Sequence, residues 1–296
     1  EIKDLNSNIL TLNANGATLE NHQYVSKDGL STTALPETYN FLNKSDDNTI
    51  IASNNSEELL LRKNSKDTII KFEKNIIAAS KKDNLLALNL NDNSIILYDL
   101  ETKSIKYKEY FKTSILNDIK IASAVFLDTA VIFPTLDGKI VLVSTKEFKQ
   151  LKVINIDPNS EINNIIFLQA IGDNLIASTS KKLFSFYSGN IAVKDFDIRS
   201  VVNDDKNVFI STLDGEIIKF DLSLNELGKR KFKYAKLFTI ALSKDHFYAL
   251  ESQEFLIKMD KDLKKIKVFD FSFDEDEKAL SIGNRIYTED KYIELK

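Results

Sequence analysis

The feature that most constrains this chain is a repeated strand–turn–strand pattern. Two copies are closely similar: residues 131–143 read VIFPTLDGKIVLV and residues 208–220 read VFISTLDGEIIKF. In each copy an Asp-Gly pair separates two runs rich in β-branched and aromatic residues, which indicates a β-hairpin because glycine supplies the positive φ that a tight turn needs. Gly138 and Gly215 lie 77 residues apart, which is twice a period of about 38 residues.

The same pattern recurs along the whole chain. Copies start near residues 9, 50, 85, 131, 175, 208, 247 and 285. Steps of roughly 40 residues that each hold four short strands are typical of β-propeller blades, and signals for helices are nearly absent. The sequence therefore predicts an all-β fold in which residues 1–296 form a single β-propeller domain of four-stranded antiparallel blades. The count of copies gives eight blades, or seven if the first and last copies share one sheet.

Closure of such a ring predicts how the chain ends are used. An isolated four-stranded sheet buries little apolar surface, so neighbouring blades stack, and the last blade usually combines strands from both chain ends. The last copy, residues 285–296, is short, which fits that arrangement. The first copy lacks a strand before its hairpin at residues 9–19. We expect that leading strand to come from the C-terminal segment or from residues before Glu1.

Composition excludes several classes of function. The formal net charge is −4, from 40 basic and 44 acidic residues of scattered sign, so no broad basic field is available for a nucleic-acid backbone. With no cysteine, disulfides, thiolate nucleophiles and cysteine-bound metals are excluded. No apolar run of about 18 residues could span a bilayer. A first residue of Glu1 in place of Met favours removal of an upstream signal or lipidated cysteine, and hence export.

Residues that could support catalysis or bind a metal are few. His22 and His246 are the only histidines, and both are expected in surface loops. The acidic run at residues 274–277 is contiguous, which is typical of a solvated loop, whereas catalytic carboxylates usually come from different strands. The Asn/Asp clusters at residues 91–93 and 204–205 are expected to cap turns. The sequence thus predicts a non-enzymatic protein without a metal or other cofactor.

The two central copies resemble the pyrroloquinoline-quinone-type propeller repeat, in which a hydrophobic strand, Asp-Gly and a second strand ending near Asp-Leu follow one another, as at residues 208–222. Within that group the chain is most similar to the BamB family of lipoproteins, subunits of the β-barrel assembly machinery of Gram-negative outer membranes. The resemblance implies a periplasmic, non-catalytic scaffold that is anchored to the outer membrane by an N-terminal lipid. Such a scaffold would bind the periplasmic domains of the barrel-assembly core subunit and assist outer-membrane protein assembly.

The resemblance also implies a partner-binding site. That family contacts its partner through a hydrophobic-plus-arginine loop leading into a Ser-Ala strand, and residues 116–124, LNDIKIASA, match that stretch. Leu116, Ile119 and Lys120 are therefore candidate contact residues, with lysine in place of the rigid arginine fork. Of the family's acidic pair on the next blade, Glu161 alone is present. The chain has no tryptophan or cysteine, so it lacks the tryptophan floor and vicinal disulfide of the quinone dehydrogenases, which argues against a quinone cofactor.

Three other interpretations follow from a propeller of this composition. An accessory or docking propeller for an exported respiratory enzyme would share the binding role and differ in its partner. A propeller hydrolase or lyase would need inward-facing acids around the channel with perturbed pKa values. A cytoplasmic propeller of the tryptophan–aspartate type would need Gly-His and Trp-Asp signatures, and the chain has neither.

Overall fold

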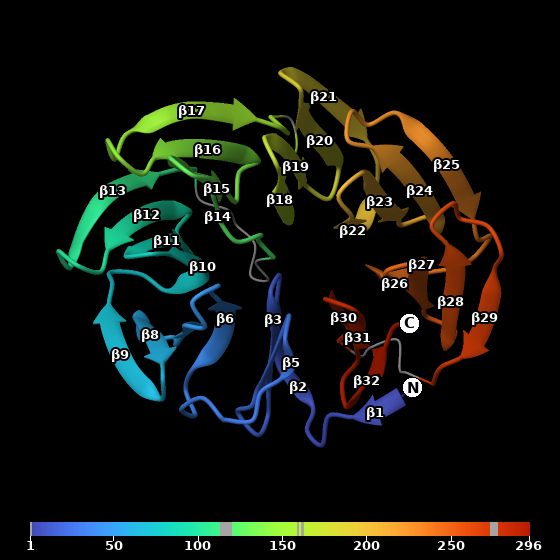
Figure 1. The fold of residues 1–296 in the computed structure, drawn as a ribbon, viewed down its shortest axis with the longest axis horizontal. Coiled ribbons are helices and arrows are strands. Elements are labelled where there is room, and N and C mark those ends of the chain that lie inside the picture. The colour runs from blue at the N-terminus through green and yellow to red at the C-terminus, as the bar shows by residue number, and fades with distance from the viewer. Residues whose placement is uncertain (1, 113–119, 159, 161–162, 273–277) are drawn as a thin grey trace. The chain divides into compact units, whose positions relative to one another are not determined.

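The computed structural model describes residues 2–112, 120–158, 160, 163–272 and 278–296, and every regular element in these ranges is a β-strand (Figure 1). The strands form eight four-stranded antiparallel sheets. The chain is therefore an eight-bladed β-propeller. The alternative of seven blades is wrong, because the first and last copies of the repeat belong to separate sheets.

The blades fall into two compact units, one made of residues 10–170 and the other of residues 1–9 and 171–296. The blades of the first unit, each given from its first to its fourth strand, are β2 (Ile9–Asn13), β3 (Gly16–Leu19), β4 (Tyr24–Ser26) and β5 (Gly29–Leu30); β6 (Asn40–Lys44), β7 (Ile50–Ser53), β8 (Glu58–Lys63) and β9 (Lys66–Lys71); β10 (Ile76–Lys82), β11 (Leu85–Leu90), β12 (Ser94–Asp99) and β13 (Ser104–Tyr110); β14 (Val125–Phe126), β15 (Ala130–Pro134), β16 (Lys139–Ser144) and β17 (Gln150–Asn155).

The second unit has the same construction, although residues 167–170 of β18 are grouped with the first unit. Its blades are β18 (Phe167–Ile171), β19 (Asn174–Ser178), β20 (Lys182–Tyr187) and β21 (Asn190–Asp195); β22 (Ile198–Asn203), β23 (Asn207–Thr212), β24 (Glu216–Asp221) and β25 (Glu226–Lys231); β26 (Leu237–Leu242), β27 (His246–Glu251), β28 (Phe255–Asp260) and β29 (Lys267–Asp270); β30 (Leu280–Ile282), β31 (Arg285–Tyr287), β32 (Lys291–Glu294) and β1 (Ile2–Asp4). That residues 1–296 form a single domain stays a prediction.

The last blade combines strands from both chain ends, as expected. Strand β1 pairs antiparallel with β32, with Ile2 opposite Ile293. The Lys3 ammonium lies 2.8 Å from the Glu294 carboxylate, which the Arg285 guanidinium approaches to 3.2 Å. The expectation for the first copy is wrong: its hairpin at residues 9–19 is formed by the first and second strands, β2 and β3, so no leading strand is missing.

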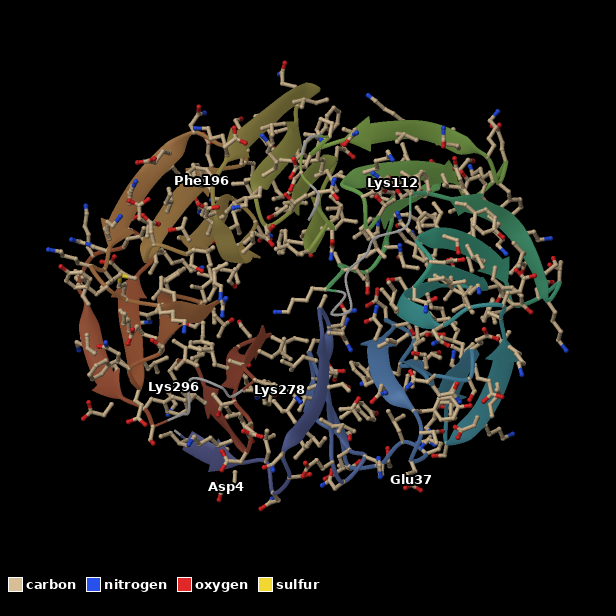
Figure 2. The ribbon with its side chains drawn as sticks, turned by 180° about the vertical axis from the view of Figure 1, so that it is seen from behind. Asp4, Glu37, Lys112, Phe196, Lys278 and Lys296 are labelled. Atoms are coloured by element: carbon tan, nitrogen blue, oxygen red, sulfur yellow. The ribbon has the colours of Figure 1, made fainter. Side chains whose placement is uncertain are left out.

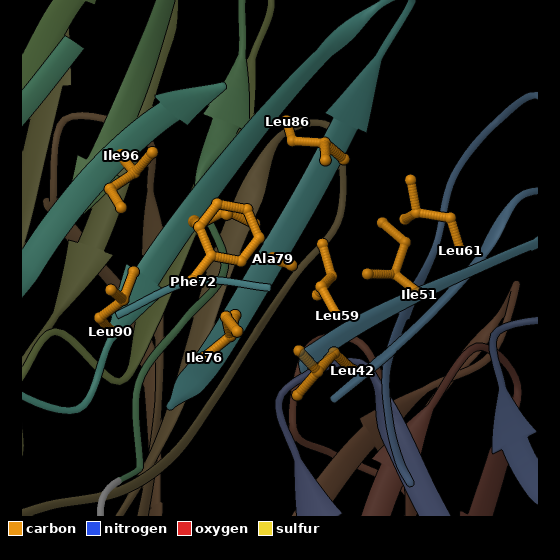
Figure 3. Close-up of a cluster of buried hydrophobic side chains, with 11 residues drawn as sticks. Leu42, Ile51, Leu59, Leu61, Phe72, Ile76, Ala79, Leu86, Leu90 and Ile96 are labelled. Atoms are coloured by element: carbon orange, nitrogen blue, oxygen red, sulfur yellow. The ribbon is translucent and has the colours of Figure 1, made fainter. Parts of the chain in front are cut away.

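Apolar side chains join neighbouring blades within a unit. The contact between the β6–β9 blade and the β10–β13 blade is a cluster of buried residues (Figure 3), comprising Leu42, Ile51, Leu59, Leu61, Phe72, Ile76, Ala79, Leu86, Leu88, Leu90 and Ile96. Full burial of one such side chain stabilises the fold by about 1.5–3 kcal/mol. The alternating strand pattern in the sequence therefore becomes a stack of sheets with dry contacts between them.

Polar side chains add a second kind of link between neighbouring blades. Asn43 on β6 donates from Nδ2 to the carbonyl of Ala79 on β10, 2.9 Å away. Ser80 on β10 donates in turn to the carbonyl of Ala124, just before β14, at 2.7 Å. Each bond runs from a side chain of one blade to the backbone of the next. Since a backbone acceptor has a fixed place along its strand, these bonds set the register between blades.

Candidate functional site

The candidate site is built on the segment that leads into β14. Lys120 is exposed, whereas the residue that follows it, Ile121, is 7% exposed and packs against Leu136. The amide of Ala122 donates to the carbonyl of Ile165 at 2.8 Å. The exposed lysine therefore stands at the edge of a buried, hydrogen-bonded segment, which limits the motion of its backbone.

A second segment, just before β18, lies against the first. Asn164 is 6% exposed and donates from Nδ2 to the carbonyl of Lys120 at 3.0 Å. Its Oδ1 is buried, and no described residue forms a hydrogen bond to it. Its neighbour Asn163 donates to the carbonyl of Asp157 at 2.8 Å. We call residues 120–124 and 163–165 together the Lys120 platform.

The structure thus brings together the described parts of the two stretches that the sequence singled out. Lys120 lies in the first stretch, and Asn164 is three residues beyond Glu161 in the second. Leu116, Ile119 and Glu161 lie outside the described residues. Sequence reasoning missed Asn164, because an asparagine in a polar stretch predicts a turn and carries no signal of a bond to another loop.

The hairpin turn between β15 and β16 supports the platform. Gly138 has φ +75°, and a Cβ there would lie 2.9 Å from Asn163 Nδ2 and 3.1 Å from the carbonyl oxygen of Asp157. The amide of Ile156 donates to the carbonyl of Gly138 at 2.8 Å. Glycine is needed at this position both for its positive φ and for the close approach of the second platform segment.

Asn93 anchors the chain at the other side of residues 113–119. Its Nδ2 donates to the carbonyl of Lys112 at 2.7 Å, and its Oδ1 accepts from the amide of Leu136 at 2.8 Å (Lys112 is labelled in Figure 2). Lys112 and Lys120 are thus both tied to neighbouring loops by a buried asparagine, Asn93 and Asn164 respectively.

The turn between β2 and β3 reaches the platform from another blade. Asn15 donates from Nδ2 to the Ser123 hydroxyl at 2.7 Å and to the carbonyl of Leu42 at 3.1 Å. The amide of Asn15 donates to Asn13 Oδ1 at 2.7 Å, which closes an Asx turn. The first and fourth blades of this unit are therefore in direct contact, a link between distant residues that the repeat pattern does not predict.

The charge that the platform presents is positive. Among the described residues no carboxylate lies within ion-pair distance of the Lys120 ammonium, whereas the nearby Asp137 is paired with Lys139 and accepts from Asn93 Nδ2 at 3.2 Å. A lysine that no described carboxylate pairs with is available to a carboxylate on another molecule. Such a group adds more to orientation and rate of encounter than to affinity.

Residues considered for other chemistry are dispersed. His246 opens β27, where its Nδ1 lies 3.2 Å from the carbonyl of Lys296, and His22 occupies a turn with φ 65°. Asp92 and Asp204 cap their own turns, as predicted: they accept from the amides of Ser94 and Lys206, each at 3.0 Å.

In the described part of the chain no three metal-binding side chains converge, and no helix is long and apolar enough to cross a membrane. The acidic run at 274–277 lies outside the described residues.

Comparison with protein families and named proteins gives two results. A family model described as the second β-propeller of RSE1, DDB1 and CPSF1 matches residues 45–293. The plasminogen-binding protein PgbB of two Helicobacter pylori strains is 37% and 36% identical to this chain over 194 residues, which is 65% of this chain. The chain spans about a third of the length of these relatives, 36% of each.

Solved structures of low sequence identity share the fold. BamB from Moraxella catarrhalis superposes with a TM-score of 0.75 at 14% identity, over 99% of this chain and 98% of that one. The C-terminal WD40 domain of Sif2 superposes with a TM-score of 0.68 at 15% identity, over 100% of this chain and 98% of that one. At these identities the likeness concerns the propeller architecture alone.

Proposed function

Since this chain belongs to the RSE1/DDB1/CPSF1 second β-propeller family, we propose that it is a protein-binding module that catalyses no reaction. The observation that carries the proposal is the Lys120 platform, where an exposed lysine with no carboxylate near it among the described residues stands on a buried, cross-linked backbone. Loops that a rigid scaffold holds in place are well suited to binding, because little conformational freedom is lost when a partner docks.

The finer form of the proposal is a BamB-like role outside the cytoplasm. In this role the chain sits in the periplasm, held at the outer membrane by a lipid, and helps outer-membrane proteins to assemble. Leu116, Ile119, Lys120 and Glu161 contact the periplasmic domains of the barrel-assembly core subunit. The likeness of the fold to BamB from Moraxella catarrhalis supports this role, as does the contact between Lys120 and Asn164, which joins the two stretches that hold these residues.

Co-purification tests the partner. The tagged chain is expressed in its native host, and membranes are solubilised and captured through the tag. Recovery of the barrel-assembly core subunit is the expected result. Recovery of a respiratory reductase would favour a docking propeller for an exported enzyme, and recovery of neither would contradict both roles.

Binding of plasminogen is a second candidate function, favoured by the 37% identity to a protein named for that activity. Immobilised chain is exposed to purified plasminogen, with heat-unfolded chain as the control. Binding to the folded chain alone would support the candidate. Equal binding to both forms would show that scattered lysines, and not a folded site, are responsible, and absence of binding would assign the activity to other parts of the relatives.

A further inference from the structure

The two most similar copies of the repeat bury one equivalent leucine to different extents. Leu136 and Leu213 each precede the Asp-Gly of their hairpin, yet Leu136 is 2% exposed and Leu213 is 58% exposed. Leu136 is covered by Ile121 and Ala78. Leu213 follows a buried strand and points its apolar side chain to solvent, so the two hairpins have different surroundings despite a shared sequence.

The loop after β25 packs directly on this second hairpin. The amide of Phe232 donates to the carbonyl of Gly215 at 2.9 Å, and the amide of Ala235 donates to the carbonyl of Phe232 at 3.1 Å. Gly215 has φ +81°, and a Cβ there would lie 2.5 Å from the carbonyl oxygen of Phe232 and 2.7 Å from that of Ala235. The turn at residues 232–235 and the hairpin tip that carries Leu213 therefore form one fixed surface.

Tyr234 is the most exposed large apolar side chain of this surface. It is 82% exposed and has φ 69°, a left-handed conformation that is rare for aromatic residues. By contrast, Phe196 in the preceding connection (Figure 2) packs its ring 5.6 Å from that of Phe220. The Lys233 ammonium lies 4.9 Å from the centre of the Tyr234 ring. An unfavourable backbone conformation thus accompanies a ring that contacts little of its own chain.

The charge around Tyr234 is positive in a chain whose net charge is −4. Residues 229–236 read KRKFKYAK, with five basic residues and no acid. The nearby acids are already paired, Asp214 with Lys231 at 2.6 Å and Glu216 with a second lysine at 2.8 Å.

Two cations of this surface have no such partner. In the described ranges no carboxylate lies within ion-pair distance of Lys233 or Arg199; the Arg199 guanidinium lies 5.5 Å from the Phe238 ring centre. Arg199 is two residues after Asp197, whose carbonyl accepts from the amide of Leu213 at 2.9 Å. Lys233 therefore lies beside the exposed tyrosine, and Arg199 lies two residues from the backbone that bonds to the exposed leucine.

We propose that Leu213, Lys233, Tyr234 and Arg199, here called the Tyr234 patch, bind an extended acidic segment of a protein partner that carries an apolar side chain. Tyrosine and arginine are among the residues most often responsible for binding energy at interfaces. The tyrosine and leucine of the patch match the apolar side chain of such a segment, and the lysine and arginine match its carboxylates. The patch shares no residue with the Lys120 platform, and the inference holds whether or not the platform binds the partner proposed for it.

The probe is a fluorescein-labelled peptide of sequence GDEFDELDG, compared with GKKFKKLKG, and binding is followed by fluorescence anisotropy. We expect the acidic peptide to bind and the basic one not to bind. Tyr234→Ser and Lys233→Gln should each raise Kd about tenfold, a typical loss for an anchor residue. Because both side chains are exposed, thermal unfolding of the variants should match that of the unmodified chain.

A matched pair elsewhere provides the control. The Lys108 ammonium also lies 4.9 Å from a tyrosine ring, that of Tyr110, which is 62% exposed, but Lys108 is paired with Glu73 at 2.6 Å. Tyr110→Ser and Lys108→Gln should leave Kd unchanged.

Four results would overturn the proposal: equal losses in the control variants, binding of both peptides alike, no binding of the acidic peptide, or self-association in light scattering that Tyr234→Ser abolishes. Retention on anionic vesicles or RNA that is lost in Tyr234→Ser, without peptide binding, would assign the patch to another class of ligand. If Tyr234→Ser lowers the unfolding temperature, the Kd of Lys233→Gln for the acidic peptide alone decides whether the proposal holds.

Discussion

Single residues decide how closely the strands and turns of this protein approach one another. Gly16 opens β3, and a Cβ there would lie 1.9 Å from the carbonyl oxygen of Val25 and 2.7 Å from the Phe41 ring. Neither the carbonyl nor the ring can move without disturbing the blade to which it belongs. The asparagines show the same dependence on packing, since Asn43 and Asn164 both donate to carbonyls of other segments.

Replacement of Gly16 by alanine should therefore destabilise the fold. We expect Gly16→Ala to lower the free energy of unfolding by about 1–3 kcal/mol, the usual cost of overpacking a tight site. Gly228→Ala is the matched control, since its nearest contact would be 4.0 Å away and its φ is not positive. Urea unfolding measures the free energy of unfolding of both variants. Equal stability of the two variants would mean that the β2–β5 blade relaxes to accept the methyl group.

At the scale of strands, the hairpins were predictable and their assignment to blades was less so. The repeat at residues 131–143 forms β15 and β16, and that at residues 208–220 forms β23 and β24. The first copy was misassigned because β1 completes the last blade, so β2 begins its own. The segment that precedes the hairpin of the 131–143 repeat forms only the short strand β14, because the amide of Ala122 bonds to Ile165 and not to a neighbouring strand.

The pairing of β1 with β32 predicts a pH dependence. Hydrogen bonds from Lys3 and then Arg285 lower the pKa of Glu294. A carboxyl with a lowered folded-state pKa adds stability that is present above its unfolded pKa, near 4.3 for glutamate, and is lost as the pH falls through the folded value. We expect Glu294→Gln to be less stable than the unmodified chain at neutral pH and to lose less stability on acidification.

Urea unfolding at neutral pH and at about pH 3, below the ordinary glutamate pKa, measures this difference. Glu226→Gln on the exposed strand β25 serves as the control, and its stability should fall on acidification as much as that of the unmodified chain. An acid response of Glu294→Gln equal to that of the unmodified chain would mean that the ion pairs of Glu294 do not hold β1 in place.

For the whole molecule, the sequence pattern was sufficient for the architecture and insufficient for the partner. Eight copies of one hairpin predicted eight blades because strand alternation and Asp-Gly turns are local properties. A binding surface depends on which loops meet, as Lys120 and Asn164 do, and on which side chains stay uncovered, as Leu213 does and Leu136 does not. Neither property can be read from one stretch of sequence.

The central claim, that the Lys120 platform binds a protein partner, is tested most directly by affinity. The partner recovered with the tagged chain is titrated against the unmodified chain, Lys120→Glu, and Lys152→Glu on the exposed strand β17 as the control. Reversal of the platform charge should raise Kd about tenfold, equivalent to about 1.4 kcal/mol, and the control should leave Kd unchanged. Unchanged affinity of Lys120→Glu, or an equal loss in Lys152→Glu, would contradict the claim.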